Sequence, residues 1–215
     1  MSDPAIRTAR PEDAAFLAAA MLAAARAHLD RGWYDIALAA PESRCLEYLR
    51  VLATTEALSW WHHSHFLIAE VDGNPAATLG AFRAGDAYAL SAPAMAQAAA
   101  GLRLSETEQA EIWQRGSYLF LCTLGDDEAW TLENIYTAPE WRGRGLAGRL
   151  IEHAVREGGD RGFAEAQITS FIGNQVAERC YRKAGFELTE EKRHADFEAA
   201  AGAPGLQRFV RRLNA

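Results

Sequence analysis

A glycine-rich segment in the second half of the chain carries the residues best suited to holding an anion. Residues 135–148 read I-Y-T-A-P-E-W-R-G-R-G-L-A-G, with Gly143, Gly145 and Gly148 near the end and an arginine on each side of Gly143. Glycine lets the backbone approach a ligand without a Cβ in between. The first turn of a helix adds unbonded amides and the positive end of its dipole. We therefore predict a phosphate or pyrophosphate site where this loop opens into a helix.

Two other phosphate-binding loops do not fit this segment. The chain has no G-x-x-x-x-G-K-S/T sequence, which excludes a P-loop nucleotidase. The three glycines match those of a dinucleotide-binding fingerprint, but they lie in the C-terminal half and not in an opening βαβ unit.

The loop resembles the acetyl-CoA loop of the GCN5-related N-acetyltransferase (GNAT) superfamily. The family pattern Q/R-x-x-G-x-G/A is met by Arg142, Gly145 and Ala147, and the strand before the loop ends in x-P as it does in the family. A second family motif, N-x-x-A-x-x-x-Y-x-K-x-G-F, follows some thirty residues later. Its matches here are Asn174, Ala177, Tyr181, Lys183, Gly185 and Phe186. The two motifs in this order make the resemblance specific over about 132–186.

The resemblance implies one α/β (α+β) domain over residues 1–215. Its core is a mixed, mostly antiparallel twisted sheet flanked by helices. Residues 1–83 would form the acceptor side and residues 129–215 the acetyl-CoA-binding half. About 45 residues, 84–128, depart from the family pattern as a helical insertion before the cofactor-binding strand.

The resemblance also implies how the cofactor is held. Backbone amides of the loop would hold the pyrophosphate. The strand end 135–137 would run beside the pantetheine arm, and an amide near Tyr136 would polarise the thioester carbonyl. The side chains of Ile135 and Tyr136 also suit a core, and Asn174 suits a helix cap as well as a pantetheine contact. The expected cofactor-binding residues are Ile135, Tyr136, Thr137, Arg142, Gly143, Arg144, Gly145, Leu146, Ala147, Gly148, Asn174 and Tyr181.

Two residues are candidates for proton transfer. Tyr181 is the candidate general acid for the departing thiolate, although it also fits the apolar stripe of its helix. Glu133 is the candidate general base for the attacking amine, with an exposed carboxylate or direct proton transfer to water as alternatives. Asn134 is expected on the opposite strand face, where it would orient the substrate.

Turn residues and hydrophobic periodicity place the motifs on regular elements. Asp13 is expected to cap the first helix, Gly32 to end it, and Ser105 with Glu108 to form a capping box. Residues 118–123 suit a strand or part of the insertion. The expected strands are 5–9, 66–71, 76–82, 130–137, 164–169, 186–190 and 206–213, and the expected helices are 13–30, a segment from 41, 93–100, 105–115, 145–157 and 174–184.

Composition and charge limit the kinds of partner that the protein is expected to bind. The net charge of −7 disfavours nucleic acid and suits a cationic acceptor. No long apolar run or export signal is present, so no membrane and a cytoplasmic location are expected. Three scattered cysteines suit buried thiols in a reducing compartment. The segment H-H-S-H at 62–65 lacks metal-ligand spacing, so no metal is expected. Relatives are commonly dimers, which leaves a homodimer open.

The function that follows is transfer of an acetyl group from acetyl-CoA to a primary amine of a small molecule or peptide, by direct attack in a ternary complex. The alternative is a non-catalytic acyl-CoA-binding sensor or interaction module. Both predict cofactor binding, and turnover separates them.

Overall fold

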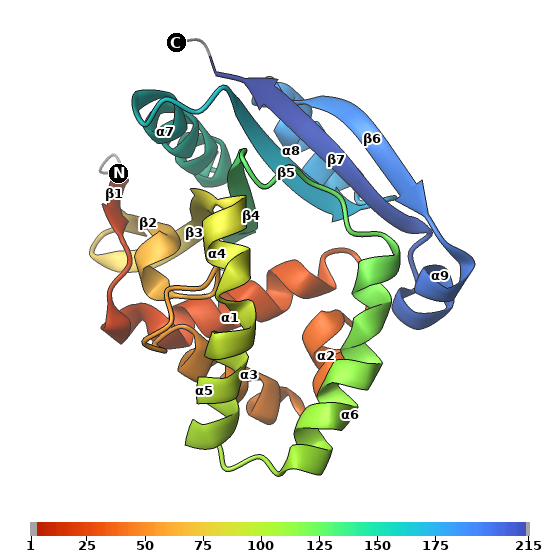
Figure 1. Ribbon diagram of the computed structural model, residues 1–215. Coiled ribbons are helices and arrows are strands. Elements are labelled where there is room, and N and C mark those ends of the chain that lie inside the picture. Colours follow the sequence, from red (N-terminus) through yellow and green to blue (C-terminus); the bar gives the residue numbers. More distant parts are fainter. Residues whose placement is uncertain (1–3, 214–215) are drawn as a thin grey trace.

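A seven-stranded sheet runs through the molecule and is covered by helices on both faces (Figure 1). The structure is a computed structural model that describes residues 4–213, so residues 1–3 and 214–215 of the expected domain lie outside the described residues. The strand order is β1-β2-β3-β4-β5-β7-β6, and every neighbouring pair is antiparallel except β4 with β5. The expected mixed, mostly antiparallel sheet is confirmed. The strands are β1 (Ala5–Thr8), β2 (Phe66–Val71), β3 (Asn74–Arg83), β4 (Trp130–Thr137), β5 (Glu165–Phe171), β6 (Glu187–Arg193) and β7 (Gly205–Arg212).

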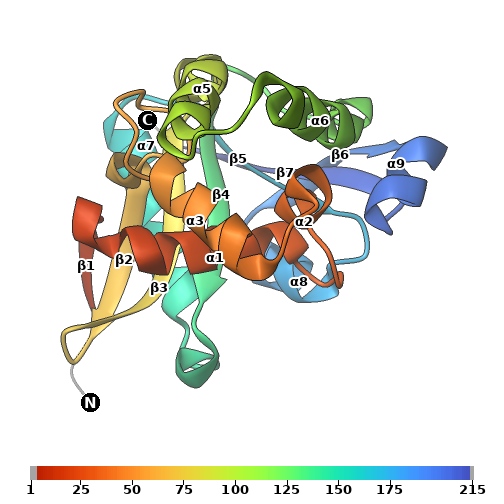
Figure 2. The ribbon, with the colours of Figure 1, turned by 90° about the horizontal axis from the view of Figure 1, so that it is seen from below.

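The helices on the two faces of the sheet come from different parts of the chain. One face of β2, β3 and β4 is covered by α7, whereas α1 lies against β3 and β4 with α3 packed on it. Figure 2 shows α1 and α3 lying across the strands. The helices are α1 (Ala14–Arg26), α2 (Trp33–Leu38), α3 (Glu42–Leu52), α4 (Ala84–Ala89), α5 (Ser91–Gly101), α6 (Glu106–Gly116), α7 (Leu146–Asp160), α8 (Gln175–Lys183) and α9 (Ala195–Ala201). Short 3-10 turns are η1 (Pro11–Asp13), η2 (His63–His65), η3 (Ser117–Leu121) and η4 (Pro139–Trp141).

The apolar stripe predicted for the helix after the glycine loop is the one that α7 buries. Leu150, Ile151 and Ala154 are fully buried against the sheet, in a cluster that also holds Leu132 of β4 and Phe209 of β7. Burial of one such leucine or isoleucine side chain contributes about 1.5–3 kcal/mol to folding. The stripe therefore fixes α7, and with it the loop at its start, relative to β4.

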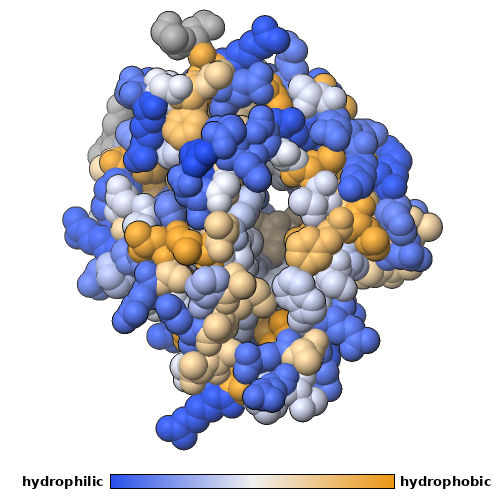
Figure 3. Space-filling model, in the orientation of Figure 1, coloured by the Kyte–Doolittle hydropathy of each residue, from blue (hydrophilic) through white to orange (hydrophobic). Residues whose placement is uncertain are grey.

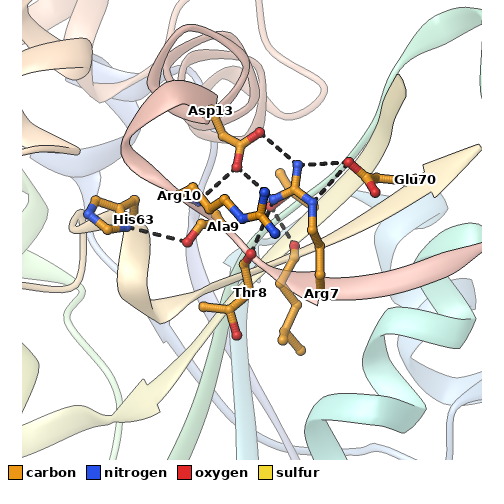
Figure 4. Close-up of polar contacts among 9 residues, drawn as sticks. Arg7, Thr8, Ala9, Arg10, Asp13, His63 and Glu70 are labelled. Carbon is orange, nitrogen blue, oxygen red and sulfur yellow. Dashed lines mark hydrogen bonds and ion pairs between the residues drawn. The ribbon is translucent and has the colours of Figure 1, made fainter. Parts of the chain in front are cut away.

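A polar network joins the first strand to the start of α1 (Figure 4). Arg7 donates from Nη1 to Asp13 Oδ2 at 2.7 Å and from Nε to Glu70 Oε1 of β2 at 2.9 Å. Asp13 also accepts from the amide of Arg10 at 2.7 Å. Asp13 is the N-cap residue of α1 as expected, but its carboxylate turns back to these donors and makes no side-chain capping bond to α1.

The first helix ends earlier than its composition indicates. It was expected to continue to about residue 30, but α1 ends at Arg26, and Ala27 takes a positive φ of 52°. The Arg26 guanidinium then holds Asp35 of α2 at 2.7 Å. Gly32 does not end α1. It begins α2 at a point where a Cβ would lie 2.4 Å from the backbone of Ala25, so only glycine permits this approach.

The expected helical insertion occupies the chain between β3 and β4. Ser105 and Glu108 form the predicted capping box at the start of α6. The helix α4 was not predicted, and residues 118–123 are not a strand but lie largely in η3. The two ends of the insertion are held together, because the amide of Gly85 donates to the carbonyl of Asp127 at 2.8 Å.

The described part of the chain has no helix that combines the length and the apolar character needed to cross a membrane.

Candidate active site

Strands β4 and β5 run parallel and then separate. Their last paired residues are Thr131 and Gln167. Beyond this point β4 stays paired with β3 and β5 with β7, so a wedge opens between residues 132–137 and residues 168–171. Figure 2 shows the two strands diverging. Backbone groups along the wedge lack a strand partner among the described residues, which suits an extended ligand that pairs as a strand would.

The vertex of the wedge is held by one buried amide side chain. Gln167 is 2% exposed, and its Oε1 accepts from the amide of Asp126 at 2.9 Å and from Arg208 Nε at 2.8 Å. Its Nε2 donates to Thr131 Oγ1 and to the carbonyl of Asp126, both at 2.8 Å. All four hydrogen-bonding positions of the Gln167 amide are thus occupied, and these bonds fix the point at which β4 and β5 separate.

The predicted anion loop lies at the far end of β4. Gly143 and Gly145 have φ values of 76° and 74°, and both are exposed. Gly145 is the N-cap of α7 in the left-handed conformation. Within residues 4–213, no backbone acceptor bonds the amides of residues 145–148. The loop therefore presents a row of donors at the positive end of a 15-residue helix.

Both arginines of the loop contact neighbouring protein groups. Arg142 is exposed and donates from Nε to the carbonyl of Thr137 at 3.3 Å. The Arg144 guanidinium stacks over Trp141 at 4.5 Å. These contacts hold two positive charges beside the loop.

The other residues expected to bind cofactor divide between core and edge. Leu146 is buried in the α7 cluster, so its side chain is structural, whereas Ala147 and Gly148 are half-buried. Ile135 packs against the same cluster, and the Tyr136 ring lies 6.1 Å from that of Phe16 on α1. The side chain of Ile135 thus takes the core role left open by the sequence, whereas Tyr136 is half-buried at the edge of the sheet.

Asn174 takes the helix-cap role that the sequence left open. Its Oδ1 accepts from the amide of Ala177 at 3.3 Å and begins α8. A pantetheine contact by Asn174 stays a prediction.

A β-bulge interrupts β4 where the wedge opens. Gly80 pairs with Glu133 and Thr78 with Tyr136, so β4 has one residue more than β3 in this interval. Asn134 has a φ of 52°, and its Nδ2 is buried without a hydrogen-bond partner in the described chain. The bulge was not predicted, because strict alternation along a strand carries no sign of an extra residue. The feature of the sequence that could have indicated the bulge is Asn134, because asparagine tolerates a positive φ better than most residues.

Three tyrosines lie close enough to the carboxylate of Glu133 to bond it or to feel its charge. Tyr88 of α4 donates a short hydrogen bond to Glu133 Oε1. Tyr34 of α2 and Tyr181 of α8 lie near enough for that carboxylate to raise their pKa values, which burial already raises. Burial also raises the pKa of Glu133 to about 7, against the opposing effect of the bond from Tyr88. One phenol thus comes from residues 1–83, one from the 84–128 insertion and one from residues 129–215.

Glu133 is half-buried on β4. Protein atoms surround its carboxylate, yet the contact with Tyr88 remains open to solvent, and Tyr88 is 36% exposed. Figure 3 shows a hollow in the middle of the face that carries α4 and α6. Sequence analysis named Glu133 and Tyr181 but missed Tyr88 and Tyr34, since neither lies in a motif.

Tyr181 is buried on α8 and packs edge-on against Phe209 at 5.6 Å between ring centres. Among the described residues no protein group hydrogen-bonds its hydroxyl. Burial raises its pKa well above 10, with smaller contributions from Cys180 and Glu133, so the phenol stays protonated at neutral pH.

The histidine segment at 62–65 has structural contacts. Burial, together with the neighbouring histidines, lowers the pKa of His62 to about 4. Its Nδ1 lies 2.7 Å from Ser64 Oγ, and His65 Nε2 lies 3.0 Å from the carbonyl of Leu58. Within residues 4–213, no group of three or more His, Cys, Asp or Glu side chains is arranged to hold a metal ion.

Comparison with known proteins identifies the family. The profile of the Acetyltransferase (GNAT) family matches residues 31–186, which is most of the chain. The chain therefore belongs to the GNAT family of acetyltransferases, and the expectation drawn from the two motifs is confirmed. No curated protein sequence matches the chain.

Solved structures share the fold at low sequence identity. An N-acetyltransferase from Staphylococcus aureus is 18% identical, with 96% of this chain and 100% of that one covered and a TM-score of 0.68. A second acetyltransferase is 16% identical, with 98% and 100% covered and a TM-score of 0.65. A Salmonella typhimurium protein solved with its cofactor acetyl-CoA is 15% identical, with 100% and 96% covered and a TM-score of 0.53.

Proposed function

We propose that this chain transfers an acetyl group from acetyl-CoA to a primary amine of a small molecule or peptide, by direct attack in a ternary complex. One observation carries the proposal. β4 and β5 part between a glycine loop whose amides at residues 145–148 have no backbone acceptor within residues 4–213, and the side chain of Glu133, which lies near enough to Tyr181 to raise the pKa of that phenol. A ligand with a diphosphate at one end and a reactive group at the other suits this arrangement.

The cofactor would be held by the second half of the chain. The amides of residues 145–148 bind the pyrophosphate, and Arg142 and Arg144 add positive charge. Residues 135–137 line the pantetheine arm along the open edge of β4. Residues 129–215 thus form the acetyl-CoA-binding half, and residues 1–83 with the 84–128 insertion form the acceptor side.

The two candidate catalytic residues divide the proton transfers. The bound acetyl-CoA supplies the thioester. As the amine nitrogen bonds to the carbonyl carbon and the carbon–sulfur bond breaks, Glu133 accepts the proton that the nitrogen loses. A pKa of about 7 lets much of this carboxyl ionise at neutral pH. The raised pKa of Tyr181 makes full proton transfer to the sulfur unfavourable, so its main role is hydrogen-bond donation to the departing thiolate.

Two measurements test the proposal. Calorimetry of the purified protein with coenzyme A should show binding, and a panel of primary amines with acetyl-CoA should release free coenzyme A. Binding without turnover on any amine would favour the non-catalytic acyl-CoA-binding module. Absence of binding would exclude both functions.

A further inference from the structure

The insertion reaches the candidate base through one residue. Tyr88 lies on α4, the first helix of the insertion, and its hydroxyl donates to Glu133 Oε1, 45 residues further along the chain. Glu133 itself lies on β4, beside the bulge at Asn134. The contact therefore joins the part of the chain that departs from the family pattern to the strand that carries the reaction.

The Tyr88 ring is held in place from two sides. It packs edge-on against Phe82 of β3 at 5.5 Å and against Trp60 at 6.1 Å. Trp60 is held in turn, because its Nε1 donates to Ser91 Oγ at 3.1 Å and its ring stacks on that of Trp61 at 4.3 Å. Four aromatic or hydroxyl side chains thus fix the direction of one phenol.

The root of the insertion fixes the helix that carries this ring. The amide of Ala84 donates to the carbonyl of Ala129 at 3.3 Å, and the amide of Gly85 donates to that of Asp127 at 2.8 Å. A Cβ on Gly85 would lie 3.2 Å from the Asp127 carbonyl oxygen, so glycine allows this close contact. The helix α4 therefore keeps a constant position relative to β4.

Within residues 4–213, no positively charged side chain is ion-paired or hydrogen-bonded to the carboxylate of Glu133. The titratable groups that face it are the phenols of Tyr34 on α2, Tyr88 on α4 and Tyr181 on α8. All three are neutral at physiological pH, because burial and the carboxylate raise their pKa values. The hydrogen bond from Tyr88 is the contact that favours the ionised carboxyl against burial.

We propose that Tyr88 is a positioning residue for Glu133, and that the 84–128 insertion is a working part of the acceptor site because it delivers this residue. The proposal rests on the proposed role of Glu133 as the base. Tyr88 binds one carboxylate oxygen and leaves the other to accept the proton of the amine. It also keeps the carboxyl ionised where burial alone would protonate it.

The first test needs no acceptor. Carbon-13 at the side-chain carboxyl carbons of glutamate reports each titration by NMR, and Glu133→Gln identifies the signal of Glu133. In Tyr88→Phe the Glu133 midpoint should rise by about one pH unit, a tenfold change in its ionisation constant. The control is Tyr118→Phe, which removes a buried insertion hydroxyl that has no hydrogen-bond partner in the described chain. This control should leave the midpoint in place.

A second variant protects the test against misfolding of Tyr88→Phe. A ring-fluorinated tyrosine at position 88 keeps the shape of the side chain and makes the hydroxyl a stronger donor. The Glu133 midpoint should then move down. An unchanged midpoint in both Tyr88 variants overturns the proposal.

Turnover separates this proposal from the proposed function. With an acceptor found in the amine panel, the acid limb of kcat should move to higher pH in Tyr88→Phe, with roughly a fivefold fall at pH 7. If Glu133→Gln kept full turnover, the proposed base would be wrong whatever Tyr88 does. If Glu133→Gln lost turnover while Tyr88→Phe left the limb in place, the positioning role alone would fail.

Discussion

The two ends of the candidate site differ in the chemical groups that they offer: main-chain groups at the glycine loop and side chains around Glu133. At the loop end, residues 143–148 offer main-chain groups to a ligand, with positive φ at Gly143 and Gly145 and, within residues 4–213, no backbone acceptor for the amides at the start of α7. At the other end, the carboxylate of Glu133 lies close to side chains from three separate helices. A site made of backbone needs glycines at fixed spacing, so it leaves a motif in the sequence. A site made of packed side chains leaves none.

The largest effect is expected from removal of the Glu133 carboxylate. Glu133→Gln keeps the size of the side chain and removes the proton acceptor, so turnover should fall by about 10²–10⁴. Coenzyme A affinity should stay the same, because the loop amides are untouched. Steady-state kinetics and calorimetry on the same preparation measure both. A normal rate would leave proton transfer to water as the mechanism.

A loss of turnover without a loss of coenzyme A affinity is also expected when the hydroxyl of Tyr181 on α8 is removed. Tyr181→Phe removes a hydroxyl that no described protein group bonds, so the fold should tolerate it. Turnover should fall by roughly 10²-fold, with coenzyme A affinity nearly unchanged. Unchanged turnover would remove Tyr181 from the mechanism and leave it as a core residue against Phe209.

At the glycine loop, one substitution should change the stability of the protein and its affinity for coenzyme A in opposite directions. Gly148 lies in the first turn of α7, and a Cβ added there would meet no other atom within 4 Å. Gly148→Ala should therefore raise stability by up to about 1 kcal/mol. If a diphosphate lies against this glycine, the added methyl group should weaken coenzyme A binding about tenfold.

The matched control is Gly159→Ala near the other end of α7, where a Cβ also meets nothing. It should stabilise the helix and leave affinity unchanged. Thermal melts and calorimetry on the two variants decide the point. Equal affinities would mean that Gly148 serves the fold and not a ligand.

The smallest expected effect concerns the stability cost of the buried carboxyl. The folded pKa of Glu133, about 7, lies above its usual value of 4.5, so the folded protein binds more protons between these pH values. Stability that is present below pH 4.5 is therefore lost as the pH rises through 7. Glu133→Gln stays neutral, so its Tm should exceed that of the natural protein by several degrees at pH 8, and the difference should shrink steadily as the pH falls toward 4.5. A constant difference across this range would contradict the raised pKa.

Sequence reasoning succeeded where local chemistry decides the structure. The Ser105–Glu108 capping box and the stripe on α7 both depend on residues a few positions apart. It failed where distant contacts decide. The end of α1 depends on the ion pair between Arg26 and Asp35 and on the approach of Gly32 to Ala25.

The candidate site follows the same division. The anion loop and Tyr181 were named from their motifs, and Glu133 from its place on the strand before the loop. The short helix α4 contains a glycine and spans six residues, too few to show a helical period. Its Tyr88 meets Glu133 only through the folded sheet, so nothing near either residue in the sequence predicts the pair.

The side chain of Gln167 has a consequence for how a ligand would enter. Its four hydrogen bonds tie the segment before β4, the strand β4 itself and β7 to a single point. The angle between the two diverging strands is thus set before any ligand arrives. An incoming pantetheine arm would meet a ready-made slot and would not have to order the protein around itself, so little conformational entropy would be lost on the protein side.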